Sequence, residues 1–262
     1  MLGIRVRTLL CCLVASVLLV GMPWEAAAQR PPIIAVAANL NFALAEIADQ
    51  FARDSGARVE LVFGASGTLT RQIQDGAPFE MFLAADEEFP QKLTAAGLTR
   101  DAGVVYAVGR LVLFAPRGSP LAVDGRLDGL ARMVKDGRIG RFAIANPEVA
   151  PYGRAAEAVL RSRGLLDAVR PHLVLGDSIA QAAQFATTGN CIGGLLAYSL
   201  VLAPGFADRG AYALIPDEDY PPLRQRMVLL KKSGPVTARF FDFVRSDAAR
   251  AVLRRHGFAV PQ

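Results

Sequence analysis

One repeated unit constrains the fold of this chain more than any other feature: a short β-rich run, a loop of small polar residues, and a stretch in which apolar residues recur every three or four positions. The first copy is expected to place a strand at 33–37, a turn at Ala38 and Asn39, and a helix after it. Later copies are expected to have strands at 59–63, 81–84, 142–145 and 173–175. Strands and helices that alternate in this way predict an α/β fold.

The chain is long enough for two hydrophobic cores. Its 262 residues, 52% of them hydrophobic, can bury two α/β lobes without disulfide or metal staples. The apolar stretch at 104–115 is expected to cross from one lobe to the other, 225–231 to cross back, and 238–255 to form a single amphipathic last helix. The predicted division is lobe 1 from 31–112 and 226–262, and lobe 2 from 113–225.

The N-terminus has the composition of a cleaved export signal. Two arginines precede an apolar run at 9–20, and 26–28 are small residues of the kind that a signal peptidase accepts. The run is shorter than the roughly 20 apolar residues that a membrane-spanning helix needs. We therefore predict a signal peptide at 1–28, cleaved near Ala28, and a periplasmic mature protein.

Cleavage would change both the charge and the cysteine content of the chain. It removes two arginines and one glutamate, which lowers the formal net charge from +5 to +4. So small a charge gives weak support for nucleic-acid binding, and no nucleic-acid partner is predicted. Cleavage also removes Cys11 and Cys12. The remaining Cys191 cannot form an internal disulfide and is expected to be a buried small hydrophobe.

Four of the strand-to-helix loops carry a small or polar residue just before a helix is expected to begin. These residues are Asn39, Ser66, Tyr152 with Gly153, and Ser178 with Ile179. In an open α/β sheet such loops gather at the carboxyl ends of the strands, and each helix start offers unpaired N–H groups with a partial positive charge. Together they predict an anion site of uncharged donors, which suits a fully ionised oxyanion. Asn and Ser are also ordinary helix caps, so any one loop alone has a structural explanation.

Sequence patterns for catalysis or metal binding are weak. The segment 64–68 approaches the G-x-S-x-G nucleophile elbow, but a threonine replaces the second glycine. His172 and His256 lie in polar surroundings that are expected to be exposed, far from Ser66. No zinc, P-loop or dinucleotide motif occurs. The acidic run at 217–219 lacks the glycine and distal glutamate of an EF-hand and is expected to be a solvated turn.

Several short segments, taken in order, resemble one known family. They are Ala37-Ala38-Asn39-Leu40, the run 63–69 with Gln72-Ile73, Gly76-Ala77-Pro78, Ala84-Ala85-Asp86, the run 146–153 that ends in Pro-Tyr-Gly, and Arg255-His256-Gly257-Phe258. This combination spans nearly the whole mature chain and resembles the periplasmic molybdate-binding proteins of ABC transporters. The resemblance implies a type II periplasmic-binding-protein fold, in which two α/β lobes joined by two crossing strands close on molybdate or tungstate.

The resemblance also implies which residues hold the oxyanion. They are Ala38 through its backbone, Asn39, Ser66 through its hydroxyl and N–H, Tyr152 through its N–H with its phenol as a candidate further donor, and Ile179 through its N–H from the other lobe. Many family members carry a tyrosine where this chain has Ala197, next to Tyr198. The combination of Asn39 with Pro-Tyr-Gly resembles a subgroup that takes its hydroxyl from the position of Tyr152, and we favour Tyr152 over Tyr198.

The family's activity is capture, not catalysis. The resemblance therefore implies a binding protein that is not an enzyme, that needs no cofactor, and that has no direct metal ligands because molybdenum is bound as an oxyanion. Its expected partner is the membrane permease of an ABC transporter, and the protein is expected to be a monomer.

Three other functions agree with parts of the sequence. A protein of the same fold could bind sulfate or another tetrahedral oxyanion, because these anions share charge and shape with molybdate. An exported serine hydrolase that uses Ser66 is less favoured, because no histidine is expected nearby. The effector region of a transcription regulator shares this fold, but no helix-turn-helix segment precedes Ile33.

Overall fold

The computed structural model describes residues 30–188 and 190–261. The signal peptide predicted at 1–28, its cleavage near Ala28, and both Cys11 and Cys12 lie outside the described residues. None of the described helices is long and apolar enough to cross a membrane. Internal contacts group Pro31–Gln262 together as one unit.

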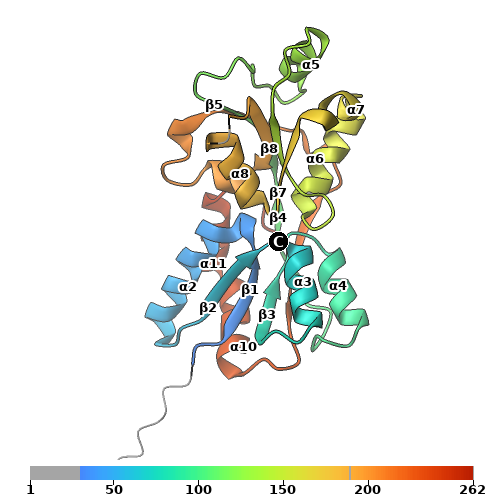
Figure 1. Ribbon diagram of the computed structural model, residues 1–262. Helices are drawn as coiled ribbons and strands as arrows, with labels where there is room; N and C mark the ends of the chain where they lie inside the picture. The colour runs from blue at the N-terminus through green and yellow to red at the C-terminus, as the bar shows by residue number, and fades with distance from the viewer. Residues whose placement is uncertain (1–29, 189, 262) are drawn as a thin grey trace, which may run out of the picture. The chain divides into compact units, whose positions relative to one another are not determined.

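The first of two sheets has five strands in the order β2-β1-β3-β10-β4 (Figure 1). The strands are β1 Ile33–Ala37, β2 Glu60–Gly64, β3 Phe79–Leu83, β4 Val104–Gly109 and β10 Leu223–Leu229. Strand β1 pairs in parallel with β2 and β3, whereas β10 runs antiparallel to β3 and β4.

Helices cover both faces of this sheet. They are α2 Asn41–Ser55, α10 Pro235–Val244 and α11 Asp247–Arg255 on one face, and α3 Ser66–Gln74 and α4 Glu88–Ala95 on the other (Figure 1). Because side chains alternate along a strand, Ile34 and Val36 of β1 pack with the first group and Ala35 packs with the second. The central strand is therefore apolar on both sides, as the continuous run at 33–37 predicts.

The second sheet also has five strands, in the order β7-β6-β8-β5-β9. The strands are β5 Leu111–Pro116, β6 Phe142–Ala145, β7 Leu173–Gly176, β8 Gly193–Ala197 and β9 Gly210–Leu214. Its helices are α5 Asp128–Lys135, α6 Pro151–Ser162, α7 Leu166–Val169, α8 Ile179–Thr188 and α9 Tyr198–Val201. Short 3-10 turns complete the chain: η1 Ala38–Leu40, η2 Arg170–His172, η3 Ala207–Arg209 and η4 Asp217–Asp219.

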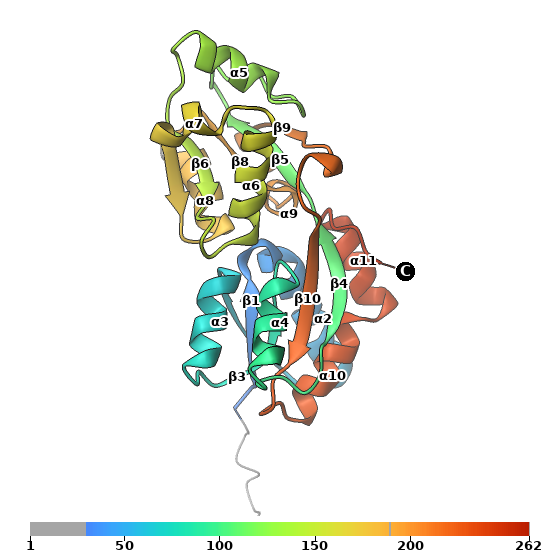
Figure 2. The same ribbon diagram turned by 90° about the vertical axis from the view of Figure 1, so that its right-hand side faces the viewer.

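Two segments connect the sheets. The stretch predicted as one crossing at 104–115 is divided into β4 and β5, which belong to different sheets and are separated by Arg110 alone. Strand β10 brings the chain back into the first sheet, where it lies beside β4 (Figure 2). Two α/β lobes joined by two crossing strands are thus confirmed; we call the first sheet with its helices lobe 1 and the second lobe 2. The residue boundaries given above stay a prediction.

Two predicted helices are wrong, one at its start and one in its middle. Helix α6 begins at Pro151 and not at 155, because proline fits the first position of a helix, where its missing N–H has no partner to lose. The single helix predicted at 238–255 is two helices, α10 and α11. Ser246 separates them because it adopts an extended backbone and caps α11, its side chain accepting a hydrogen bond from Ala249 N.

Candidate functional site

The five predicted ligand residues all lie where a strand leads into a helix. Ala38 and Asn39 are in η1 directly after β1, Ser66 opens α3 after β2, Tyr152 is the second residue of α6, and Ile179 is the first residue of α8. None of the five is more than 4% exposed. The first N–H groups of a helix lack intrahelical partners and carry a partial positive charge, so these positions offer donors to an anion.

Asn39 and Tyr152 come from different lobes and meet through a residue that the sequence analysis did not single out. Gln225 of β10 is fully buried. Its Oε1 accepts a hydrogen bond from Asn39 Nδ2 at 3.1 Å, and its Nε2 donates to Tyr152 Oη at 3.4 Å. The sequence signal that could have found Gln225 is a polar residue within a strand that is otherwise expected to be apolar.

Ser66 is held from within lobe 1 and lies next to a contact with lobe 2. Its Oγ accepts a hydrogen bond from Ala85 N at 3.0 Å, which leaves the hydroxyl proton available to a ligand. The following residue, Gly67, donates from its N–H to Val149 O at 2.8 Å. A Cβ on Gly67 would lie 2.8 Å from the Phe89 ring and 3.0 Å from the Val149 backbone, so this approach of the two lobes requires glycine.

A second residue that the sequence analysis missed also connects the lobes. The Oγ of Ser199, in α9, donates to Asn39 O at 2.7 Å, and both residues are buried. Helix α8, which begins with Ile179, packs against η1. The structure thus joins Asn39 to Tyr152 by hydrogen bonds and places Ser66 and Ile179 on elements that contact the opposite lobe.

We call the buried region where the two lobes meet the seam; its residues are Asn39, Ser66, Tyr152, Ile179, Ser199 and Gln225, and none of their side chains is charged. Burial, reinforced by the nearby Tyr220, raises the pKa of Tyr152 far above its ordinary value, so its phenol keeps its proton and remains able to donate. Burial has the same effect on the pKa of Tyr106, whose Oη lies 3.0 Å from Ala84 O and 3.1 Å from Gln225 Oε1. An anion in the seam would meet neutral donors.

Charged residues lie beside the seam and form what we call the charged rim, made of Asp86, Glu88 and Arg154. Arg154 of α6 pairs with Asp86 at 2.5 Å and lies 3.6 Å from Glu88, so the rim joins lobe 2 to lobe 1. Burial raises the pKa of Asp86 to about 6, although a hydrogen bond from Phe89 N and the charge of Arg154 act in the opposite direction. The Arg154 charge is therefore already matched by carboxylates.

Tyr198 has a different environment from Tyr152. Its ring packs against Tyr212, with the two centroids 5.7 Å apart, and the guanidinium of Arg110 lies 5.6 Å from its centroid. A Cβ on Gly257 would also collide with this ring. Tyr198 is thus packed between other side chains, and the choice of Tyr152 over Tyr198 as the hydroxyl donor stays a prediction.

The remaining candidates from the sequence do not join the site. His256 Nε2 lies 3.0 Å from Glu46, and its side chain is 16% exposed, so the expectation of an exposed histidine is wrong there. His172 is half-buried in η2, and Cys191 is buried as expected. Within 30–188 and 190–261, no cluster of three or more His, Cys, Asp or Glu residues could hold a metal ion.

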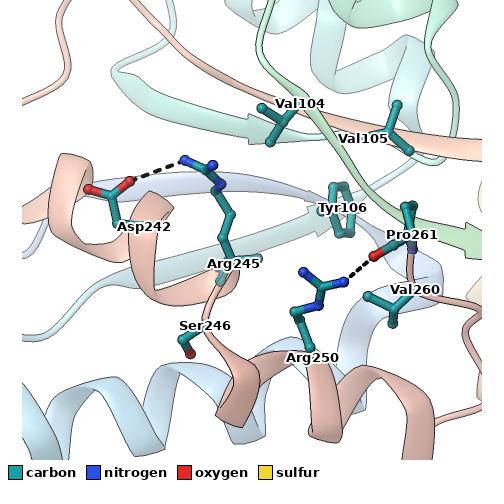
Figure 3. Close-up of a pocket in the computed structure, with 10 residues that line it drawn as sticks. Val104, Val105, Tyr106, Asp242, Arg245, Ser246, Arg250, Val260 and Pro261 are labelled. Atoms are coloured by element: carbon teal, nitrogen blue, oxygen red, sulfur yellow. Dashed lines mark hydrogen bonds and ion pairs between the residues drawn. The ribbon is translucent and has the colours of Figure 1, made fainter.

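A pocket of about 440 Å³ lies between β4 and the helices α10 and α11, and contains none of the five predicted ligand residues (Figure 3). Tyr106, Arg245 and Arg250 are among its lining residues. Arg245 pairs with Asp242, and Arg250 donates to Pro261 O. Both guanidinium groups are therefore already paired.

Two α/β lobes, two crossing strands and a buried seam of helix starts define a type II periplasmic binding protein. Residues 33–259 match the family described as bacterial extracellular solute-binding proteins, and this chain belongs to that family.

Individual relatives are similar over almost their whole length. The molybdate-binding protein of Azotobacter vinelandii is 40% identical over 238 residues, which cover 89% of this chain and 92% of the relative. The molybdate-binding protein of Rhodobacter capsulatus is 36% identical over 255 residues, which cover 96% of this chain and 97% of the relative. The solved structure of the Azotobacter vinelandii periplasmic molybdate-binding protein matches with a TM-score of 0.79 and 29% identity, covering 88% of this chain and all of that one.

Proposed function

We propose that this protein captures molybdate outside the cytoplasm and delivers it to the membrane permease of an ABC transporter. The observation that carries the proposal is the buried seam at which uncharged donors from both lobes meet, with Asn39 and Ser66 from lobe 1 and Tyr152 and Ile179 from lobe 2. Such a seam suits an anion without protons, because that anion accepts hydrogen bonds from every direction. The relatives from two organisms, both described as molybdate-binding proteins, support molybdate as the anion.

Each ligand residue has a role in this proposal. Asn39 donates from its side-chain amide, Ser66 from its hydroxyl and N–H, and Ala38, Tyr152 and Ile179 donate from backbone N–H groups. Because the donors come from both lobes, the anion stabilises the closed form more than the open form and shifts the population toward it. The closed form is the one that the permease recognises.

The remaining parts of the proposal follow from the same chemistry. Tungstate binds at the same site, because it has the charge and tetrahedral shape of molybdate. The protein works in the periplasm as a monomer, without a cofactor, and catalyses no reaction.

Titration calorimetry with molybdate, tungstate, sulfate and phosphate tests the proposal. We expect tight binding of molybdate and tungstate, and sulfate binding that is weaker by at least about tenfold. A tenfold difference in affinity needs a difference of only about 1.4 kcal/mol in binding free energy between the two anions. Tight sulfate binding without molybdate binding would instead support a sulfate-binding protein of the same fold. Ester hydrolysis that disappears in Ser66→Ala would support a hydrolase.

A variant of Asn39, one of the two side chains that meet at Gln225, locates the site. Asn39→Ala is expected to weaken molybdate binding about tenfold or more, because one buried donor is lost. Tyr198→Phe is the matched control, since Tyr198 makes ring contacts outside the seam. Equal affinities for Asn39→Ala and the parent protein would show that the ligand lies elsewhere.

A further inference from the structure

The side-chain amide of Gln225 is placed to decide which atoms of the seam face the anion. We propose that Gln225 and Asn39 turn their amides over together when the anion binds, so that Asn39 presents its Nδ2 to the ligand while Gln225 donates to Asn39 Oδ1. Gln225 is then a positioning residue, and it makes the seam selective for anions that carry no proton. This inference rests on the proposed function.

The first observation is a buried acceptor without a partner. Asn39 donates from Nδ2 to Gln225 Oε1, and its own Oδ1 is one of the few fully buried polar side-chain atoms without a hydrogen bond in the described part of the chain. An acceptor that faces an oxyanion repels it, because the anion has no proton to donate. Turning the Asn39 amide by 180° replaces this oxygen by a nitrogen that donates.

The second observation is that Tyr106 has more acceptors within reach than protons. Its Oη lies 3.0 Å from Ala84 O and 3.1 Å from Gln225 Oε1, but a phenol donates one hydrogen bond. If the Gln225 amide turns as well, its Nε2 takes the place of Oε1. Tyr106 then donates to Ala84 O and accepts from Gln225, so neither oxygen is left facing another acceptor.

With both amides turned, each polar group of the network has a complementary partner. The two N–H groups of Gln225 donate to Tyr106 Oη and to Asn39 Oδ1, and its Oε1 accepts from Tyr152 Oη. Asn39 Nδ2 is left to donate to the anion. Turning one amide alone would set two oxygens or two nitrogens against each other at the 3.1 Å separation, so the two amides are coupled.

The local backbone supports a specific placement of Gln225. The register of β10 against β4 shifts between Gln225 and Arg226. Gln225 pairs with Ala107 and Arg226 pairs with Val105, so Tyr106 of β4 has no partner residue in β10. A bulge of this kind re-aims side chains, which lets the Tyr106 hydroxyl reach Gln225. Gly109 leaves the space for the network, since a Cβ there would lie 2.6 Å from Gln225 Nε2 and 2.2 Å from Tyr152 Oη.

The test compares Gln225→Met with Gln225→Glu by calorimetry with molybdate between pH 5.5 and 8. Methionine has a similar length but cannot donate, and we expect it to weaken binding about tenfold or more at every pH. Glutamate cannot donate when ionised, and its charge repels the anion, so Gln225→Glu is expected to bind least at pH 8. As the pH falls and the buried carboxyl takes up a proton, it can donate to Asn39 Oδ1. At pH 5.5 Gln225→Glu is therefore expected to bind more tightly than Gln225→Met.

Two controls separate this role from a purely structural one. Thr237→Val removes a hydrogen bond of another fully buried side chain, the one from Thr237 to Glu80, and is expected to leave molybdate affinity unchanged. Thermal unfolding of each variant shows that it is folded. The inference is overturned if Gln225→Met binds as tightly as the parent protein, or if Gln225→Glu stays weaker than Gln225→Met at pH 5.5. Absence of molybdate binding by the parent protein would overturn the proposed function itself.

Discussion

The two lobes meet in two chemically different regions, the uncharged seam and the charged rim. In the seam, Asn39, Ser66 and Gln225 are at most 1% exposed. In the rim, the side chains of Asp86, Arg154 and Glu88 are 14%, 36% and 54% exposed. Removing an ion from water costs several kcal/mol even when it is paired, whereas a hydrogen-bonded amide or hydroxyl is buried at much lower cost. Under the proposed function, the seam would recognise the ligand and the rim would adjust how readily the lobes close.

Placing a charge in the seam is expected to have the largest effect. Asn39→Asp keeps the side-chain shape but places a negative carboxylate in the buried seam, next to the molybdate dianion. Because little water screens this repulsion, we expect molybdate affinity to fall by about 100-fold or more. Asn41→Asp, which adds the same charge at the more exposed first turn of α2, is the control and should change affinity much less. Calorimetry measures both. Similar losses in the two variants would mean that net charge, and not the seam, decides binding.

The pH dependence of stability is expected to report the burial of the rim. The pKa of Asp86 is raised from an ordinary 3.8 to about 6, so the folded protein takes up a proton more readily than the unfolded chain between these values. The sign follows from this difference: Asp86 contributes stability below about pH 4, and this contribution, about 3 kcal/mol, is lost as the pH rises through 6.

Chemical denaturation of the parent protein and of Asp86→Asn from pH 4 to 7 measures this contribution. Asparagine has the same shape and does not titrate, so the free energy of unfolding of the parent relative to the variant should fall across this range. A difference that is constant with pH would show that Asp86 titrates normally.

Filling the space between the lobes is expected to have an intermediate effect on binding. The Cβ of Gly67→Ala would press on Val149 of lobe 2 and on Phe89, which opposes closure, and we expect about a tenfold loss of affinity. Gly234→Ala is the matched control, because its Cβ would approach Glu80 no closer than 3.5 Å, which is an ordinary contact. If both alanine variants bind molybdate like the parent protein, the lobes do not need this close approach.

Removing the rim cation is expected to have the smallest effect. Arg154→Gln breaks a partly exposed ion pair, and such pairs contribute about 1 kcal/mol or less. We expect a change in molybdate affinity of roughly threefold or less, and a smaller change at 0.5 M salt than at low salt, because salt screens exposed charges. A large loss that persists at high salt would place Arg154 among the ligand residues.

The sequence predicted much of the fold because its signals are local. The apolar run at 142–145 is β6 as predicted, and the helix starts at Asn39, Ser66 and Ile179 lie where strand patterns give way to helical ones. Helix boundaries were predicted wrongly where two local signals competed. At 238–255 the apolar period continues through the break, and only the cap made by Ser246 reveals that there are two helices.

The network around the candidate site could not be predicted in the same way. Gln225 and Ser199 are separated from Asn39 by 186 and 160 positions in the sequence, so no periodicity or motif links them to it. The position of the Tyr106 hydroxyl depends on a bulge in the pairing of β4 with β10, which is a property of two strands and not of either one.

By itself, the sequence determined the α/β units, the two crossings and the polar residues that begin the helices, because these depend on hydrophobic spacing and turn chemistry within short windows. The tertiary structure alone decided that Asn39 and Tyr152 share the amide of Gln225, and that the seam is uncharged while the rim is charged. Hydrogen bonds of buried groups are settled by which partners lie within about 3 Å, and that distance is fixed only when distant segments pack together.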